Sequence, residues 1–300
     1  MKEIYTLADL RNWDRIDDAS DVPIRLGVFG DPVAHSLSPQ MQNAALENCG
    51  IEMQYARFEI SAGELEEALA FLPRLNFVGV NLTVPHKMAA LSFLDEADEN
   101  ARAIGAVNTV VVKNGRLHGC NTDGAGFSDA ITSGIFGNVS LSQLPVLILG
   151  AGGAARAIAR ECVRQGCPKV SLSNRTYHAA KTLCDELMKM GGRTEIEMVA
   201  QDASSFGHAV AKARLIVNAT SAGLRPNERS LIPRDWLNES HLVYDTIYNP
   251  PRTSLLMEAE AAGAKFANGI TMLLYQGARS FELWFDRKAP IEVMRTALHL

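Results

Sequence analysis

The chain has 300 residues, of which 47% are apolar and 21% charged, and its 29 Lys and Arg against 34 Asp and Glu give a formal charge of −5. These proportions are typical of a globular protein and exclude a disordered or fibrous chain, while the length suggests two domains. The acidic balance argues against a nucleic-acid partner, because such proteins usually carry a basic surplus.

Targeting and cysteine patterns exclude further classes. The N-terminus carries charges throughout, which argues against a signal peptide, and the longest apolar stretch, 144–155, is too short to span a bilayer. The five cysteines form no C-x-x-C pair, which argues against zinc knuckles and a disulfide framework. We therefore expect a cytoplasmic protein with reduced thiols, no metal site and no membrane partner.

The N-terminal half is predicted to alternate between strands and helices after a polar extension, residues 1–22, which contains a short amphipathic piece around 7–13. Apolar runs predict the strands, and Ser-Pro, Gly and Pro signals limit the helices. A hairpin is expected over 106–119, turning at Asn114-Gly115. The predicted strands are 25–30, 54–60 and 77–84, and the predicted helices are 38–50, 63–73 and a segment opened by Pro85.

A second alternating series follows, and the boundary between the two is expected near 123–143, where a helix and a Gly/Ser-rich stretch separate them. Such alternation predicts parallel sheets with helices on both faces, an α/β fold of two domains. The predicted strands are 145–150, 169–175, 195–200, 213–220 and 241–248, and the predicted helices are 151–166, 176–190, 254–262 and 270–287.

A glycine-rich motif opens the second series. Gly150-Ala151-Gly152-Gly153-Ala154-Ala155 fits G-x-G-x-x-G/A, and it follows an apolar strand and opens a helix, which is the context that dinucleotide binding requires. Gly150 permits the tight turn, and Gly152 lets the backbone approach a pyrophosphate at the helix N-terminus. The alternative is a glycine-rich turn without a ligand. We predict a Rossmann-type, doubly wound dinucleotide-binding domain.

The end of the next predicted strand indicates which dinucleotide is bound. NAD-binding proteins usually place Asp or Glu there for the ribose 2′-hydroxyl, whereas this chain has Asn174, Arg175 and Thr176. A guanidinium flanked by hydrogen-bond donors suits a 2′-phosphate, so we predict NADP. The alternative is that Arg175 only ends a strand at the surface.

Polar residues at predicted strand ends in the N-terminal half form a candidate substrate site. Ser36 and Ser38 lie in a loop before a helix, where two hydroxyls suit a carboxylate, although Ser38 could be only an N-cap. Thr83 and Lys87 follow a strand, and ligands of open α/β sheets bind at the carboxyl ends of strands. Asn108 and the segment 121–123 could be part of the site or ordinary turn residues.

Taken in order, these motifs resemble the shikimate dehydrogenase family from about residue 25 to the end of the sequence. The motifs are S-L-S-P with M-Q-N (36–43), N-L-T-V-P-H-K (81–87), G-A-V-N-T (105–109), G-x-N-T-D (119–123), G-A-G-G-A (150–154), N-R-T (174–176), N-A-T-S-A-G (218–223), D-T-I-Y-N-P (245–250) and Y-Q-G (275–277). The chain departs from the family pattern at Gln42, where relatives usually have His, and at Thr271, where they often have Gly.

The resemblance implies reversible, NADP-linked reduction of 3-dehydroshikimate to shikimate in aromatic amino acid biosynthesis. It implies an N-terminal mixed α/β substrate domain, 1–123 with 270–300, and an NADP domain, 124–269. It implies a monomer or homodimer whose partner is a small molecule. By carry-over, the catalytic residues are Lys87 and Asp123; the substrate-binding residues are Ser36, Ser38, Thr83, Lys87, Asn108, Asp123, Tyr248 and Gln276; and the cofactor-binding residues are Gly150, Ala151, Gly152, Gly153, Ala154, Asn174, Arg175, Thr176, Thr220, Thr246 and Gly269.

Two alternatives stay open. A quinate or dual quinate/shikimate dehydrogenase belongs to the same family, but Ser38 and Thr176 favour shikimate and NADP. A non-catalytic NADP-binding sensor would have no chemical need for Lys87 and Asp123. His35 and His86 lie beside the motifs, and neither is expected to act directly on the substrate.

Overall fold

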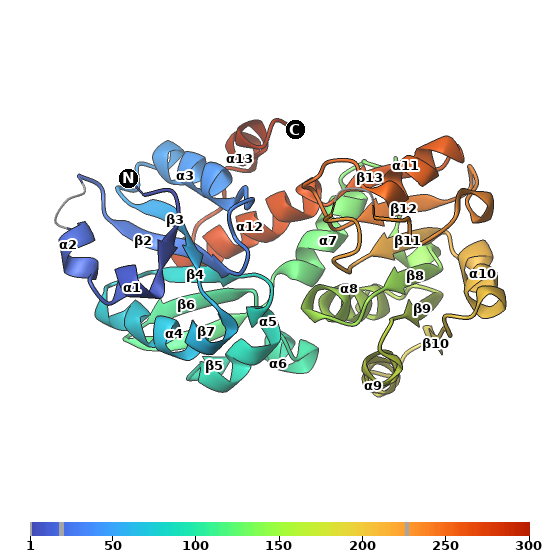
Figure 1. Ribbon diagram of the computed structural model, residues 1–300, viewed down its shortest axis with the longest axis horizontal. Coiled ribbons are helices and arrows are strands. Elements are labelled where there is room, and N and C mark those ends of the chain that lie inside the picture. The colour runs from blue at the N-terminus through green and yellow to red at the C-terminus, as the bar shows by residue number, and fades with distance from the viewer. Residues whose placement is uncertain (1, 18–20, 226–227) are drawn as a thin grey trace. The chain divides into compact units, whose positions relative to one another are not determined.

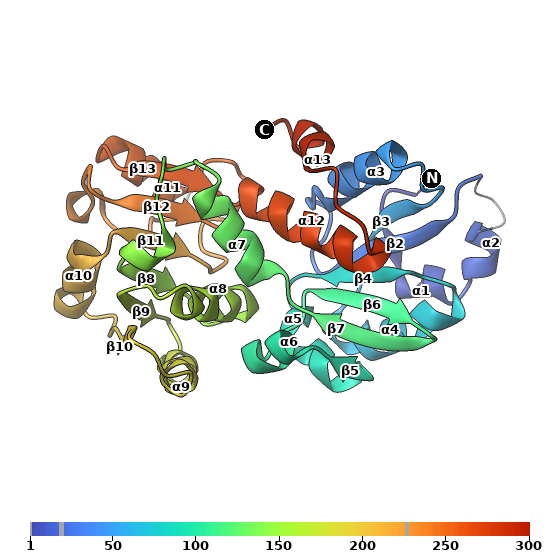
Figure 2. The same cartoon turned by 180° about the vertical axis from the view of Figure 1, so that it is seen from behind.

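The computed structural model describes residues 2–17, 21–225 and 228–300. Two compact units divide the chain: unit 1 comprises Met1–Thr122 and Leu273–Leu300, and unit 2 comprises Asp123–Met272. The sequence places the limits at 123/124 and 269/270, so Asp123 falls in unit 2 rather than in the first domain. Figures 1 and 2 show the elements of each unit from opposite sides.

Unit 1 is built around a seven-stranded sheet of order β1-β3-β2-β4-β6-β7-β5. Strands β1, β3, β2 and β4 are parallel, and β6 is antiparallel to both of its neighbours, so the sheet is mixed. The strands are β1 (Tyr5–Thr6), β2 (Ile24–Gly30), β3 (Gln54–Glu59), β4 (Gly79–Leu82), β5 (Glu96–Ala97), β6 (Thr109–Lys113) and β7 (Arg116–Cys120). The helices are α1 (Leu7–Leu10), α2 (Trp13–Asp17), α3 (Ser38–Asn48), η1 (Ala62–Glu64), α4 (Leu65–Arg74), α5 (His86–Ala89), η2 (Ala90–Phe93), α6 (Glu99–Ile104), α13 (Ile291–Ala297) and most of α12 (Ile270–Phe285).

The N-terminal segment is part of the core, which corrects the prediction of a polar extension. Strand β1 pairs with β3, and Trp13 is 2% exposed among the rings of Tyr5, Phe58 and Phe77. Leu7 and Leu10 are also buried in this cluster. The local sequence hides this role because charged residues separate the apolar side chains, of which Tyr5, Leu7, Leu10 and Trp13 are buried in the core.

The predicted hairpin is confirmed. Strands β6 and β7 are antiparallel, with Lys113 opposite Arg116, and Asn114 and Gly115 form the turn between them. Both turn residues have positive φ, 53° and 73°, the backbone that Asn and Gly adopt most readily. The hairpin carries Asn108, at its start, and Asn121, at its end, to the same edge of the sheet.

Unit 2 contains a six-stranded, all-parallel sheet of order β10-β9-β8-β11-β12-β13. Helices cover both faces (Figure 1), and residues of α10 and α11 share one hydrophobic core with Leu147 and Leu149 of β8. The strands are β8 (Val146–Leu149), β9 (Lys169–Ser173), β10 (Glu195–Met198), β11 (Leu215–Asn218), β12 (Leu242–Asp245) and β13 (Lys265–Asn268). The helices are α7 (Asp123–Thr132), η3 (Leu141–Gln143), α8 (Gly153–Arg164), α9 (Tyr177–Met188), α10 (Ala203–Lys212), η4 (Arg234–Trp236) and α11 (Ser254–Ala261).

Within residues 2–17, 21–225 and 228–300, none of the helices combines the length and the apolar character needed to cross a membrane. Across the same residues, no group of three or more His, Cys, Asp and Glu side chains is arranged to hold a metal ion. All five cysteines are free, and Cys162, Cys167 and Cys184 are buried. Burial raises the pKa of the Cys184 thiol to about 11, so this cysteine is a poor nucleophile at neutral pH.

Candidate functional site

The turn after β8 has the geometry of a phosphate-binding loop. Gly150 has φ 118°, and a Cβ there would lie 2.8 Å from the carbonyl oxygen of Ala219, so only glycine fits. Helix α8 begins at Gly153, and a Cβ at Gly152 would meet no atom within 4 Å. The turn is therefore tight on the protein side and open where a pyrophosphate would approach the helix N-terminus.

This turn lies at the point where the strand order of unit 2 reverses. Strand β8 is flanked by β9 on one side and by β11 on the other, so the chain leaves β8 in one direction and later returns to its opposite edge. Such a switch point leaves a crevice at the carboxyl ends of the strands. At the end of β11, the backbone N–H of Thr220 donates to Asn218 Oδ1 at 3.0 Å, and the Thr220 hydroxyl donates to the same oxygen at 2.7 Å.

The turn from β9 to α9 fits a phosphorylated ribose. It contains Asn174, Arg175 and Thr176 and no carboxylate, and the side chains of Arg175 and Thr176 are exposed. The Asn174 amide donates to the carbonyl oxygen of Thr176 at 3.0 Å, which shapes the turn. A carboxylate here would repel a 2′-phosphate, whereas an exposed guanidinium attracts it.

A buried carboxylate fixes the loop after β12. Asp245 is fully buried, and it accepts hydrogen bonds from Asn218 Nδ2 at 3.0 Å, from the N–H of Ile247 at 3.0 Å and from the Thr253 hydroxyl at 2.6 Å. Burial is the largest influence on its pKa, which is raised despite these hydrogen bonds. These contacts fix the loop that carries Thr246 and Tyr248.

Thr246 and Gly269, two of the predicted cofactor-binding residues, are in direct contact. The N–H of Gly269 donates to the carbonyl oxygen of Ile247 at 3.1 Å, and a Cβ at Gly269 would collide with the carbonyl oxygen of Thr246. The close approach of the two backbones requires glycine at 269.

Thr271, where relatives often have Gly, has a structural partner. Its hydroxyl lies 3.0 Å from the hydroxyl of Tyr244, which is fully buried and also accepts from the N–H of Met272 at 3.1 Å. A buried phenol needs such partners, so this departure from the family pattern satisfies Tyr244.

In unit 1, the loop between β2 and α3 presents Ser36 and Ser38. Helix α3 begins at Ser38 itself, and the position before it, Leu37, makes no side-chain cap. The alternative reading of Ser38 as an N-cap is therefore wrong; instead Ser36 Oγ accepts from the N–H of Ser38 at 3.3 Å. Arg57 donates to the carbonyl oxygen of Ser36 through Nε at 3.0 Å and Nη2 at 2.7 Å, which fixes the loop against β3.

Thr83 and Lys87 are half-buried at the carboxyl end of β4, on either side of the start of α5. Between them, His86 is 1% exposed, and its Nε2 lies 2.8 Å from the carbonyl oxygen of Ile60. A carbonyl only accepts, so Nε2 carries the proton, and Nδ1 is buried without a hydrogen-bond partner. Burial lowers the pKa of His86, which anchors α5 as a neutral ring.

The structure brings Asn108 and Gln276 together in unit 1. Asn108 is 1% exposed just before β6, and its Nδ2 donates to Gln276 Oε1 on α12 at 3.2 Å. The N–H of Thr122 donates to Asn108 Oδ1 at 2.8 Å. Residues from the two ends of unit 1 thus form one polar cluster at the end of its sheet.

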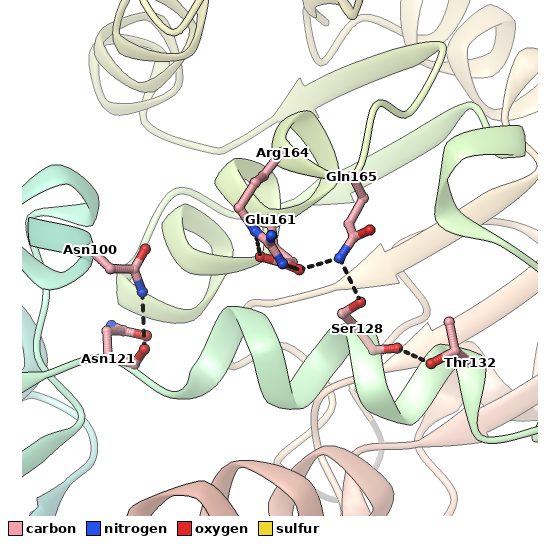
Figure 3. A network of polar contacts seen from close by, with 7 residues as sticks. All are labelled: Asn100, Asn121, Ser128, Thr132, Glu161, Arg164 and Gln165. Carbon is pink, nitrogen blue, oxygen red and sulfur yellow. Dashed lines mark hydrogen bonds and ion pairs between the residues drawn. The ribbon is translucent and has the colours of Figure 1, made fainter. Parts of the chain in front are cut away.

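Asp123 and Tyr248 belong to unit 2, whereas the other predicted substrate residues belong to unit 1. Asp123 is 2% exposed at the first position of α7. Figure 3 shows how α7 is held against α8: Gln165 Nε2 donates to Glu161 at 2.8 Å and lies 3.3 Å from the Ser128 hydroxyl. A Cβ at Gly124 would lie 2.8 Å from the carbonyl oxygen of Ala157, so the two helices approach closely at the start of α7.

Sequence reasoning missed several residues that support the site. Arg57 was read only as part of a strand, although a lone guanidinium in an otherwise mostly apolar run signals a specific partner. Asn218 and Thr253, which bind Asp245, lie in separate segments, so only the fold brings them together. Ser280 is fully buried beside Asn81 and Thr109, and nothing in its local sequence marks it.

A parallel sheet with a glycine-rich turn at its switch point defines a dinucleotide-binding protein, and the polar cluster of unit 1 adds a second set of groups suited to a small polar molecule. Three family models match the chain: "Shikimate dehydrogenase substrate binding domain" over 28–110, "Shikimate / quinate 5-dehydrogenase" over 131–238 and "Shikimate 5'-dehydrogenase C-terminal domain" over 269–299. The chain belongs to the shikimate dehydrogenase family.

Individual relatives agree with this assignment. Shikimate dehydrogenase (NADP(+)) of Methanopyrus kandleri is 42% identical over 275 residues, 91% of this chain and 94% of the relative. The structure of shikimate 5-dehydrogenase from Thermus thermophilus with NADP(H) and shikimate is 39% identical with a TM-score of 0.81, covering 92% of this chain and 98% of that one. Quinate dehydrogenase from Corynebacterium glutamicum with NAD is 31% identical with a TM-score of 0.80, covering 93% and 99%.

Proposed function

We propose that this protein is an NADP-dependent oxidoreductase that reversibly reduces 3-dehydroshikimate to shikimate in aromatic amino acid biosynthesis. One observation carries the proposal: in a single unit, the end of β4 presents Thr83 and Lys87, and the same sheet end holds the buried Asn108 hydrogen-bonded to the half-buried Gln276. The relatives named for this activity, about 40% identical over nine-tenths of the chain, support it.

The residues of unit 2 fit NADP. The open backbone at Gly152 would hold the pyrophosphate, Arg175 with Asn174 and Thr176 would hold the 2′-phosphate, and the Thr246–Gly269 contact would border the nicotinamide. We assign Gly150, Ala151, Gly153, Ala154 and Thr220 to the walls of the same site. When bound, NADPH supplies a hydride from its nicotinamide ring.

Lys87 and Asp123 provide the proton that carbonyl reduction requires. The oxygen of the substrate carbonyl gains negative charge as the carbon is reduced, and an ammonium beside it stabilises that charge and can donate a proton. In the reverse direction the same pair accepts the proton of the alcohol. Ser36 and Ser38 bind the substrate carboxylate, and Thr83, Asn108, Tyr248 and Gln276 orient the ring.

Steady-state rates with two substrates and two cofactors test the proposal. We expect reduction of NADP with shikimate to be the fastest of the four combinations of shikimate or quinate with NADP or NAD. Faster turnover of quinate would assign the chain to the quinate branch of the family. Cofactor binding without turnover of either substrate would indicate an NADP-binding sensor.

We further propose a cytoplasmic location and a monomer or homodimer. All five cysteines are free, which supports the first, since structural disulfides are rare in cytosolic proteins. Light scattering of the purified protein measures the second directly, and a larger mass than that of a dimer would contradict it.

A further inference from the structure

Ser280 is a fully buried serine on α12, one helical turn after Gln276. Its hydroxyl donates to the carbonyl oxygen of Gln276 at 3.0 Å, a bond that serines often make within helices. Its other contacts lie outside the helix: Asn81 Nδ2 donates to it at 3.0 Å, and Thr109 Oγ1 lies 2.8 Å away. One hydroxyl therefore joins α12 to β4 and to β6.

The amide of Asn81 has a fixed orientation in this network. The Tyr55 hydroxyl donates to Asn81 Oδ1 at 2.8 Å, and Asn81 Nδ2 lies 3.1 Å from the carbonyl oxygen of Asn108. Because a carbonyl only accepts, the nitrogen must face Asn108 and Ser280. Asn81 thus ties Ser280 to the backbone of Asn108.

The side chains of Asn108 and Gln276 are oriented in the same way. The N–H of Thr122 points at Asn108 Oδ1, so Asn108 presents its Nδ2 as a donor. Gln276 Nε2 donates to the carbonyl oxygen of Leu273 at 2.9 Å, so Gln276 presents Oε1 as an acceptor. Asn108 uses one lone pair of this oxygen, and the second can accept from an incoming hydroxyl.

We propose that Ser280 is a positioning residue that holds Gln276 Oε1 as the acceptor for a ring hydroxyl of the substrate. The inference rests on the proposed function. Ser280 bonds the backbone of Gln276, and it accepts from Asn81 Nδ2, which also donates to the carbonyl oxygen of Asn108 at 3.1 Å. Both members of the Asn108–Gln276 pair are therefore held through a hydroxyl that does not itself touch the substrate.

The Ser280→Ala variant tests this role. Removing the hydroxyl takes one acceptor from Asn81 Nδ2, which keeps the carbonyl oxygen of Asn108, and removes the side-chain bond to the carbonyl oxygen of Gln276. We expect the KM for shikimate to rise about 10-fold, while kcat changes less than about 3-fold and the affinity for NADP is unchanged. Ser280→Cys, which keeps a weak donor of similar size, should give an intermediate KM.

Trp284→Phe is the matched control on the same helix. Trp284 Nε1 donates to the carbonyl oxygen of Val110 at 3.0 Å, so this residue also docks α12 on the sheet but lies two turns from Gln276. We expect a lower melting temperature and an unchanged KM for shikimate. If Ser280→Ala behaves like this control, Ser280 has only a structural role and the inference is wrong.

A double-mutant cycle with Gln276→Ala completes the test. If Ser280 acts through Gln276, Ser280→Ala adds no further increase in KM to the Gln276→Ala enzyme; independent, additive increases would overturn the inference. If Ser280→Ala does not fold, the test rests on Ser280→Cys: an unchanged KM for shikimate in that variant would overturn the inference. If the wild-type protein does not turn over shikimate, the proposed function itself is wrong. If the wild type is active and Ser280→Ala leaves the KM for shikimate unchanged, only the proposed role of Ser280 is wrong.

Discussion

Lys87 is half-buried at the start of α5, where an ammonium can meet the oxygen that gains charge during reduction. Lys87→Ala should lower kcat at least about 100-fold, because general acid catalysis and oxyanion stabilisation are both lost. The affinity for NADP, measured by fluorescence titration, should change little. Lys113→Ala, which removes an exposed lysine from β6, is the control. Near-normal turnover of Lys87→Ala would contradict the assignment.

His86 gives a prediction of pH-dependent stability. Burial lowers its pKa from the ordinary value of 6.5, so the folded protein holds His86 neutral while the unfolded chain takes up a proton below that pH. The stability that His86 contributes is therefore complete above pH 6.5 and is lost as the pH falls through the lowered pKa. His86→Gln keeps a donor for Ile60 but cannot titrate.

Urea midpoints of wild type and His86→Gln should therefore converge as the pH falls below 6.5, and the variant should lose less stability than wild type between pH 7.5 and 5. Parallel midpoints across that range would show that the pKa of His86 is the same in the folded and the unfolded protein, and would contradict the prediction.

The turn between β9 and α9 determines cofactor choice in our proposal. Arg175→Ala should raise the KM for NADP roughly 10- to 100-fold, since a charge-assisted hydrogen bond contributes about 1.5–3 kcal/mol, and should leave the KM for NAD similar. Arg193→Ala, which removes an exposed charge beyond α9, is the control. Equal effects of both variants on NADP would mean that only the overall charge of unit 2 matters.

The contact between the end of β12 and the start of α12 is intolerant of a side chain. Gly269→Ala should destabilise the protein by about 1–3 kcal/mol, because its Cβ collides with the carbonyl oxygen of Thr246 and one backbone must move. Gly63→Ala, whose Cβ would meet no atom within 4 Å, should be neutral. Thermal unfolding of both variants measures the difference, and equal melting temperatures would show that the backbone adjusts freely.

Elements with a continuous apolar pattern were predicted from the sequence, whereas several short or polar ones were missed. Strand β8 and helix α8 lie where the sequence places them, because a buried parallel strand needs an unbroken apolar run. Helix α10 was missed, since its Ser and Gly residues are weak helix formers and Ala209 and Val210 are its buried residues. Strand β13 has four residues, and its pairing with β12 decides its structure.

At the scale of the whole molecule, the N-terminal segment contributes to the stability of unit 1. Trp13→Ala should cost about 3–5 kcal/mol, the usual cost of deleting a large buried aromatic side chain, and should lower the melting temperature markedly. Asn12→Ala, at an exposed neighbour, should change it little. A small effect of Trp13→Ala would show that the segment is dispensable for the fold.

The candidate site illustrates what a sequence can and cannot predict. Motifs identified Asn108 and Gln276 individually, but their contact joins residues 168 positions apart, which no local pattern encodes. The hydrogen-bond direction of each amide depends on the N–H of Thr122 and the carbonyl oxygen of Leu273, which only the folded backbone places. Local sequence patterns therefore predict the turns and strands, whereas the polar network depends on contacts between residues that are far apart in the chain.

Unit 1 is assembled from two stretches of chain separated by about 150 residues, the whole of unit 2. A ribosome adding roughly 5–20 residues per second needs about 10–30 s to synthesise that interval. During that time Trp284 has not been synthesised and cannot fill the space beside Gly79, although β1 is already available to cover the edge of β3. Unit 2 is therefore the first unit that can complete its fold on the nascent chain, even though its synthesis starts second.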